Sequence, residues 1–161
     1  MEKAIIFIGA DHNGFDLKEE IVKYLKSIEF KVEDIGTNNS KTFLDFPDYA
    51  LAVCKKVLSI KNSLGILICE TGIGMSICAN KIKGIRCELG YDHYTSRMGK
   101  EHNNSNVLAL EGKTTGILIA KNAVDMFINS EFLSDPIKYN HYNRVVKIGQ
   151  LEERIFCNIK K

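Results

Sequence analysis

The segment Ser63–Lys81, SLGILICETGIGMSICANK, carries three local signals that together indicate a parallel α/β fold. Residues 65–69 form a short, almost entirely apolar run with β-branched side chains, which is typical of a strand buried on both faces of a parallel sheet. Two glycines, Gly72 and Gly74, interrupt this run, and the residues from Ser76 to Lys81 favour a helix. The segment therefore predicts a strand, a glycine turn and a helix in succession.

The predicted glycine turn has the chemistry of an anion site. Backbone N–H groups at a helix N-terminus lack intrahelical partners, and the helix dipole favours negative charge there. Cys69 occupies the last position of the strand, at the edge where open parallel sheets bind their ligands. A simpler interpretation of Cys69 is a small side chain that packs in the core, because free cysteine is among the most buried residue types.

Known nucleotide and phosphatase motifs do not fit this segment. The G-x-G-x-x-G dinucleotide fingerprint would need glycine where Ile77 stands, and the Gly-Lys-Ser/Thr of the P-loop is absent. A cysteine-phosphatase loop would need arginine at the position of Met75. These three classes are set aside.

Length, charge and cysteine usage restrict the class of protein. The chain of 161 residues is predicted to be one domain spanning 1–161, and its formal net charge of +2 comes from basic residues scattered among acidic ones. We expect no nucleic-acid partner and no membrane partner. The five cysteines form no C-x-x-C pair, which favours a reducing compartment and disfavours structural zinc. The apolar run near the N-terminus is too short for a signal sequence, so a cytoplasmic location is expected.

The remaining chain alternates apolar strand patterns with helical periodicity. Strands are expected at 3–10, 30–36, 65–69, 85–91 and 106–110, and helices at 16–28, 47–60, 76–81, 92–101, 114–129 and 142–158. Asp16 and Glu19 have the spacing of a capping box at the first helix. This alternation predicts a three-layer α/β/α Rossmann-like fold with a five-stranded parallel sheet. The last helix is surplus to that fold, and we expect it to pack on a partner subunit.

Polar residues cluster where the predicted strands end. Asp11 and His12 follow the first strand, Asp45 follows the second, and Cys69 with Thr71 ends the third. Each of these residues also has a plain structural interpretation. Asp11 suits a turn, and two residues elsewhere, His102 and Arg144, suit a helix-end cation and a solvated helix charge.

Taken together, these residues resemble the RpiB/LacAB sugar-phosphate isomerases, most closely the ribose-5-phosphate isomerase B branch of that family. The resemblance runs in order over about residues 3–148. The matching pieces are Ala10-Asp11-His12 with Gly14-Phe15, Asp45-Phe46-Pro47 with Tyr49-Ala50, 65–69, Thr71-Gly72 with Gly74, Ala79-Asn80-Lys81, Gly84-Ile85-Arg86, His102-Asn103 and Asn106-Val107-Leu108.

The resemblance implies interconversion of ribose 5-phosphate and ribulose 5-phosphate through an enediolate, without cofactor or metal. It implies that Cys69 moves the proton as a thiolate, a form that helix N-termini favour, and that His102 opens the sugar ring with help from Thr71. The remaining roles implied by the family are an oxyanion hole at Gly72, Ile73 and Gly74, sugar contacts from Asp11 and Asn103, and phosphate contacts from His12 and Arg144. Family members are dimers or tetramers whose active sites combine residues of two subunits.

Several positions depart from the family pattern. Glu70 stands where the family usually has glycine, and we expect it among the substrate-binding positions with its carboxylate directed away from the thiol. Lys113 and Asn140 replace two family arginines, so Lys138 or His141 is a candidate substitute at the phosphate. Phe46 replaces a common tyrosine.

Two alternatives remain open at this level. The same chemistry on a six-carbon sugar phosphate, such as allose or galactose 6-phosphate, would depend on pocket size. The galactose enzymes of the family divide the catalytic residues between two different subunits, and one chain that carries both Cys69 and His102 argues against that arrangement. A non-catalytic sugar-phosphate sensor would not require the thiol.

Overall fold

The computed structural model describes residues 3–43 and 45–158, including the side chains up to residue 155. These residues form a five-stranded sheet in the order β2-β1-β3-β5-β4, and every pair of neighbouring strands is parallel. The strands are β1 Ile5–Ala10, β2 Lys31–Asp34, β3 Leu64–Cys69, β4 Cys87–Leu89 and β5 Val107–Glu111. The helices are α1 Phe15–Ser27, α2 Phe46–Ser59, α3 Ile73–Ala79, α4 His93–Asn103, α5 Ile117–Asn129 and α6 His141–Asn158.

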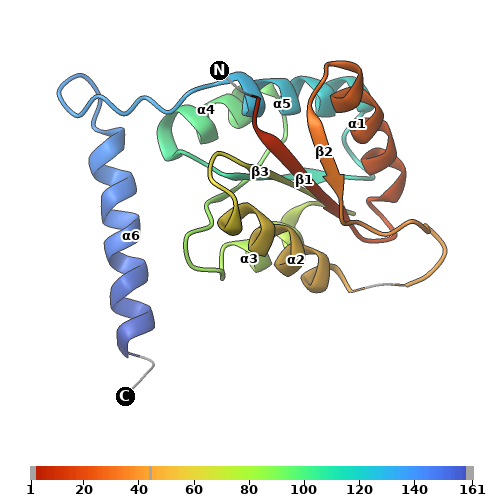
Figure 1. Cartoon of the computed structure of the whole chain (residues 1–161), viewed down its shortest axis with the longest axis horizontal. Helices are drawn as coiled ribbons and strands as arrows, with labels where there is room; N and C mark the ends of the chain where they lie inside the picture. The colour runs from red at the N-terminus through yellow and green to blue at the C-terminus, as the bar shows by residue number, and fades with distance from the viewer. Residues whose placement is uncertain (1–2, 44, 159–161) are drawn as a thin grey trace.

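Helices cover both faces of the sheet, as the alternating pattern predicts (Figure 1). One core lies between the sheet and α1 and α5, with Ile66 and Ile68 of β3 on this side and Phe127 of α5 packed against them. The other core lies under α2 and α3 and contains Leu67 and Cys69 of the same strand. This alternation along one strand is what a strand buried on both faces requires. The three-layer prediction is confirmed.

The strand order places the sheet's switch point between β1 and β3. The chain passes from β1 to β2 on one side and reaches β3 on the other, with Ala10 paired to Ile68 near the ends of the two strands. In open parallel sheets the loops diverge at such a point and leave a crevice at the carboxyl ends. The loops that carry Asp11 and Cys69 therefore flank the same crevice.

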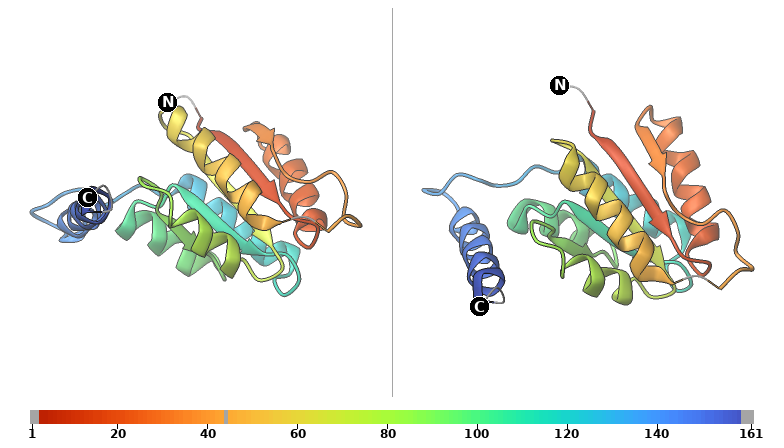
Figure 2. Two further views of the ribbon diagram at one scale, coloured as in Figure 1. Left: turned by 90° about the horizontal axis from the view of Figure 1, so that it is seen from below. Right: turned by 60° about the horizontal axis from the view of Figure 1, so that its bottom comes forward.

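Helix α6 lies beside the rest of the molecule, joined to it by an extended segment (Figures 1 and 2). Glu152 of α6 accepts hydrogen bonds from the Gly84 amide at 3.0 and 3.1 Å, and Glu153 pairs with Lys83 at 2.6 Å. Several of its described apolar residues are exposed, among them Leu151 at 56% and Ile155 at 58%. Exposed apolar residues on an outlying helix favour a protein partner, and docking on a second subunit stays a prediction.

Helix starts differ from the sequence-based expectation by one to three residues, and α5 begins at Ile117 instead of 114. Helix α1 begins at Phe15 after Gly14, and the predicted capping box of Asp16 and Glu19 is wrong. The reason is that Asp11 Oδ1 accepts the Asn13 and Gly14 amides at 3.0 Å each, so the chain has already turned before Asp16.

Helix α3 begins at Ile73 rather than Ser76. The turn is completed earlier than expected because Gly72 adopts a left-handed conformation with φ 71°. The helix is only 7 residues long, and the Asn80 side chain ties its end to the backbone of Cys87 through two 2.8 Å hydrogen bonds. Among the described residues, no helix combines the length and apolar character needed to cross a bilayer.

Candidate active site

A cavity of about 370 Å³ opens at the carboxyl ends of β1 and β3. Its walls come from the loop after β1, the end of the loop before α2, and the glycine turn after β3. The lining residues are Asp11, His12, Asn13, Phe43, Asp45, Phe46, Cys69, Glu70, Thr71 and Gly74. The topology thus brings together the polar clusters that the sequence places after three separate strands.

Cys69 borders this cavity at the end of β3. It is only 5% exposed, and strand alternation directs its side chain to the face covered by α2 and α3. Its carbonyl accepts the Gly112 amide at 2.7 Å, which ties the end of β3 to the turn after β5. The thiol is therefore a buried group that borders a cavity.

Asp11 is also buried, at 5% exposure. One carboxylate oxygen accepts two backbone amides of the following turn, so the structural interpretation of Asp11 as a turn residue is confirmed. The residue lines the cavity as well. A turn carboxylate fixed in this way is a rigid acceptor, and rigid acceptors orient sugar hydroxyls well.

His12 lies at the mouth of the cavity under an aromatic ring. The centroids of the Phe43 ring and the His12 imidazole are 4.8 Å apart at an interplanar angle of 44°. The side-chain Nδ2 of Asn13 lies 3.3 Å from Nε2 of His12. Phe43 itself is 80% exposed. Sequence reasoning missed Phe43 and Asn13, although the apolar residues within the otherwise polar segment 37–46 were a signal that this loop contributes to a site.

The glycine turn is tightly packed. A Cβ at Gly74 would lie 2.8 Å from the ring of Phe46, so glycine allows α2 and α3 to approach at this point. The Ile73 amide donates to Thr71 Oγ1 at 3.3 Å. This amide is therefore satisfied within the protein, and the predicted oxyanion hole depends on the amides of the glycines on either side of it.

We expect Gly72→Ala to destabilise the fold by about 2 kcal/mol or more, because it combines two penalties. The left-handed conformation disfavours a Cβ, and that Cβ would lie 2.6 Å from Leu89 Cδ1 and 3.0 Å from the Leu110 carbonyl oxygen. Urea unfolding of both proteins measures the difference. Gly116→Ala is the matched control, since nothing lies within 4 Å of its Cβ position. Equal midpoints for the two variants would contradict this packing argument.

The other predicted site residues gather at the end of α4 and the start of α6. His102 stacks on His141 with ring centroids 4.0 Å apart and an interplanar angle of 11°, and Tyr139 stacks on the same ring at 5.9 Å. Loss of hydration and the neighbouring charges of His102 and Arg144 lower the pKa of His141. Asn140 accepts the Arg144 amide through its carbonyl at 3.4 Å, so both phosphate candidates belong to this group.

Within one chain these two groups lie at opposite ends of the strands. The carbonyls of Asn103 and Asn104 accept from Arg86 Nε at 3.1 and 2.8 Å, and Arg86 immediately precedes β4. Cys69, by contrast, pairs with Glu111 at the end of β5. The length of β5, roughly 15 Å at about 3.3 Å per residue, therefore separates the two groups along the strand direction. A single chain does not bring His102 to Cys69.

Lys113 and Glu70 lie at the carboxyl ends of the strands, as Cys69 does. The Lys113 amide donates to the Glu70 carbonyl at 3.3 Å, and both side chains are exposed. Lys138 belongs to the group that contains His102, with Nζ 5.1 Å from the centre of the Tyr139 ring. That the Glu70 carboxylate is directed away from the thiol stays a prediction.

The described residues contain no group of three or more His, Cys, Asp or Glu side chains arranged to hold a metal ion. The residues that line the cavity supply a thiol, an imidazole, carboxylates and backbone amides.

The chain is similar to known proteins along nearly its whole length. A family model described as ribose/galactose isomerase matches residues 6–148. The chain belongs to this family. It is 38% identical over 149 residues to ribose-5-phosphate isomerase B of Escherichia coli, covering 92% of this chain and 97% of that protein. It is 40% identical over 136 residues to galactose-6-phosphate isomerase subunit LacB of Clostridium acetobutylicum, covering 84% and 77%.

Solved structures of this family share the fold. Ribose-5-phosphate isomerase B of Clostridium thermocellum superposes with a TM-score of 0.88 at 40% identity, covering 94% of this chain and 99% of that one. The enzyme of Mycoplasma genitalium with bound ribulose-5-phosphate gives 0.87 at 34% identity, covering 95% and 99%. The sequence-based recognition of an RpiB-type sugar-phosphate isomerase is confirmed.

Proposed function

We propose that this isomerase interconverts ribose 5-phosphate and ribulose 5-phosphate. The observation that carries the proposal is the position of Cys69, a thiol that ends β3 at the switch point of the sheet and borders a cavity with Asp11 and His12. The names of the solved relatives support the five-carbon substrate, among them the one that contains ribulose-5-phosphate.

In this proposal the Cys69 thiolate removes the proton from C2 of the open-chain aldose and returns it to C1. The electrons of the C2–H bond form the enediolate, whose negative oxygen O1 faces the glycine turn, where the Gly72 and Gly74 amides are the candidate donors. As C1 takes up the returned proton, the O2 hydroxyl proton passes to O1, which leaves the C2 ketone and the C1 hydroxyl. Asp11, fixed by two backbone amides, orients the sugar hydroxyls. No external electron acceptor is needed, because the oxidation of C2 and the reduction of C1 balance within one molecule.

Ring opening requires a second acid–base group, and we assign it to His102 of a partner subunit with Thr71 assisting. The support is geometric, since His102 and Cys69 of one chain lie at opposite ends of the strands. In a symmetric dimer, an isologous contact that brings the end of α4 to the partner's cavity supplies His102 to both sites at once. Asn103 and Arg144 would enter with His102, and Arg144 would then share the phosphate with His12.

The exposed apolar residues of α6 support this dimer. Ile148 is 44% exposed, and the more exposed Leu151 and Ile155 follow it at helical spacing. Burying such a stripe against a second copy would also stabilise the outlying helix. Whether dimers associate further into tetramers is a separate question for solution scattering.

Assays with three substrates test the substrate assignment. We expect ketose formation from ribose 5-phosphate with a kcat/KM at least tenfold above that for allose 6-phosphate or galactose 6-phosphate. The physical reason is that the cavity of about 370 Å³ has to contain the whole substrate together with the partner's side chains. A preference for a six-carbon substrate would replace the five-carbon assignment. Binding of all three without any ketose formation would leave only a sensor.

A further inference from the structure

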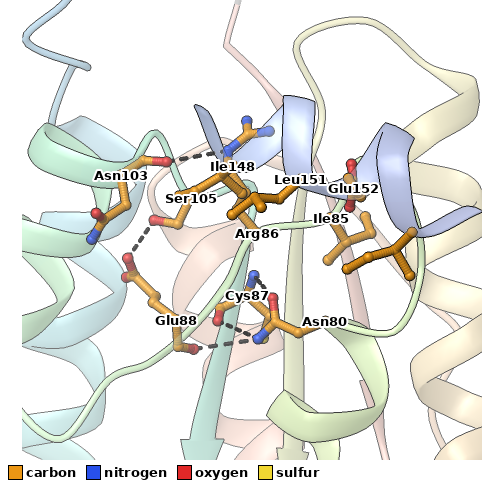
Figure 3. Close-up of a pocket in the computed structure, with 11 residues that line it drawn as sticks. Asn80, Ile85, Arg86, Cys87, Glu88, Asn103, Ser105, Ile148, Leu151 and Glu152 are labelled. Atoms are coloured by element: carbon orange, nitrogen blue, oxygen red, sulfur yellow. Dashed lines mark hydrogen bonds between the residues drawn. The ribbon is translucent and has the colours of Figure 1, made fainter. Parts of the chain in front are cut away.

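A second ionisable group, Glu88 on the edge strand β4, is half-buried and lies outside the cavity that holds Cys69. Its Oε2 accepts a hydrogen bond from the Ser105 hydroxyl (Figure 3). Its Oε1 is buried and has no hydrogen-bond partner among the residues that the structure describes. Burial raises the pKa of this carboxyl to about 8, against the smaller opposing effects of Ser105 and Lys100. Glu88 is therefore mostly neutral at pH 7.

Helix α4 has a gap that fits this carboxyl group. A Cβ at Gly99 would overlap Glu88 Oε2, so only glycine lets the helix approach the strand here. Glycine inside a helix lowers its stability, so such a position needs a packing reason. Ser105 supplies the donor from the other side. Three residues from β4, α4 and the turn after α4 thus fit together as one unit.

This unit holds the turn that follows the proposed catalytic His102. Arg86 Nε donates to the carbonyls of Asn103 and Asn104, and Lys100 Nζ donates to the carbonyl of Ser105 at 3.1 Å. Figure 3 shows Arg86, Glu88 and Ser105 on the same side of the cavity between β4 and α6. The turn is therefore tied to β4 through both its backbone and its one hydroxyl side chain.

The charged groups around Glu88 leave its ionised form poorly compensated. Lys100 of α4 is half-buried, loss of hydration lowers its pKa against the smaller opposing attraction of Glu88, and its ammonium donates to the Ser105 carbonyl. Arg86, which immediately precedes β4, donates to the turn carbonyls and lies near Glu152 of α6. Cys87 lies beside Glu88 on the strand, and α3 contributes only the neutral amide of Asn80 to the lining of this cavity. Among the described residues, none of these cations forms an ion pair with Glu88.

We propose that Glu88 is a positioning residue that, as the neutral acid, fastens the turn after α4 to β4 and thereby sets the position of His102 and Asn103. Ionisation of Glu88 places a negative charge in a site without a paired cation, and the carboxylate then moves toward water. The turn loosens with it, and the two residues carried by the end of α4 lose their alignment. This inference rests on the proposed function of His102.

The pH dependence of activity tests the proposal. With ribose 5-phosphate as substrate, we expect kcat of the wild type to fall about tenfold between pH 7 and pH 9, as expected for a required acid with a pKa of about 8. Glu88→Gln keeps an acceptor for Ser105 and cannot ionise. The kcat of this variant at pH 9 should therefore equal its own kcat at pH 7. Glu88→Ala should have a reduced kcat at both pH values, and Glu88→Gln should restore it. Superimposable profiles of the wild type and Glu88→Gln would overturn the proposal.

Hydrogen–deuterium exchange provides a readout that does not depend on activity. The Asn104 and Ser105 amides donate to the carbonyls of Lys100 and Gly99, at 3.1 and 3.3 Å. After correction for intrinsic rates, these amides should exchange at least fivefold faster at pH 9 than at pH 7 in the wild type and equally in Glu88→Gln. No ketose from the wild type at any pH would refute the proposed function, while the exchange data would still decide whether Glu88 fastens the turn. Unchanged exchange in the wild type would overturn that part.

Discussion

Replacing Cys69 with alanine is expected to lower kcat for ribose 5-phosphate by on the order of 10³-fold or more, because the proposed reaction then has no base beside C1 and C2. The substitution removes one small side chain from the border of a cavity, so the fold should persist. The measurement is single-substrate kinetics of ketose formation, together with a thermal unfolding curve. A KM within a fewfold of the wild-type value would place the loss in the chemical step.

Cys78→Ala is the matched control for this variant. Cys78 belongs to the same core region and lies on α3 only nine positions further along the chain, and its sulfur donates weakly to the Pro47 carbonyl at 3.8 Å. Burial raises the pKa of this thiol, which keeps it protonated. Its removal should leave kcat within about twofold of the wild type. Equal losses for both cysteine variants would contradict a specific role for Cys69, and full activity of Cys69→Ala would exclude it as the base.

Mixing two inactive variants is expected to restore activity. Cys69→Ala and His102→Ala each damage every site of their own dimer. A mixed dimer contains one site with both substitutions and one with neither, because each proposed site combines Cys69 of one subunit with His102 of the other. Random exchange of subunits yields half mixed dimers, so the mixture should recover about a quarter of wild-type activity.

The experiment requires subunit exchange, achieved by joint refolding from urea or by coexpression with two different affinity tags. Refolding each variant alone provides the background. Lack of recovery in mixed dimers isolated by both tags would mean that Cys69 and His102 act within one chain. That result would contradict the separation of the two residues along the strand direction inferred from the hydrogen bonds of Arg86.

Local sequence was sufficient for the type and order of the elements. The apolar run that ends at Cys69 and the glycines that follow it predict β3, the turn and α3, because strand burial and glycine conformations are short-range properties. The errors lie at helix starts. Side chains that reach back to the backbone decide those positions, as Asp11 does for α1, and periodicity does not reveal such contacts.

Residue pattern also predicted which side chains carry the chemistry, but not how they are distributed in space. That Cys69 and His12 share a cavity follows from the pairing of β1 with β3. That His102 lies at the other end of the strands follows from the direction of α4, which returns along the sheet after β4. These are long-range consequences of strand order, and no local signal specifies them.

By itself, then, the sequence determined the parallel α/β fold and the family, since these depend on short motifs and their order, and it predicted that Cys69 is the reactive thiol. Only the tertiary structure decided that the proposed site falls into two groups at opposite ends of the strands and that the Glu88 carboxyl group packs against α4 at Gly99. The physical reason is that burial and proximity arise from packing between distant segments. A carboxylate on an edge strand suggests a solvated side chain until the Gly99 gap and the Ser105 hydroxyl show where it is held.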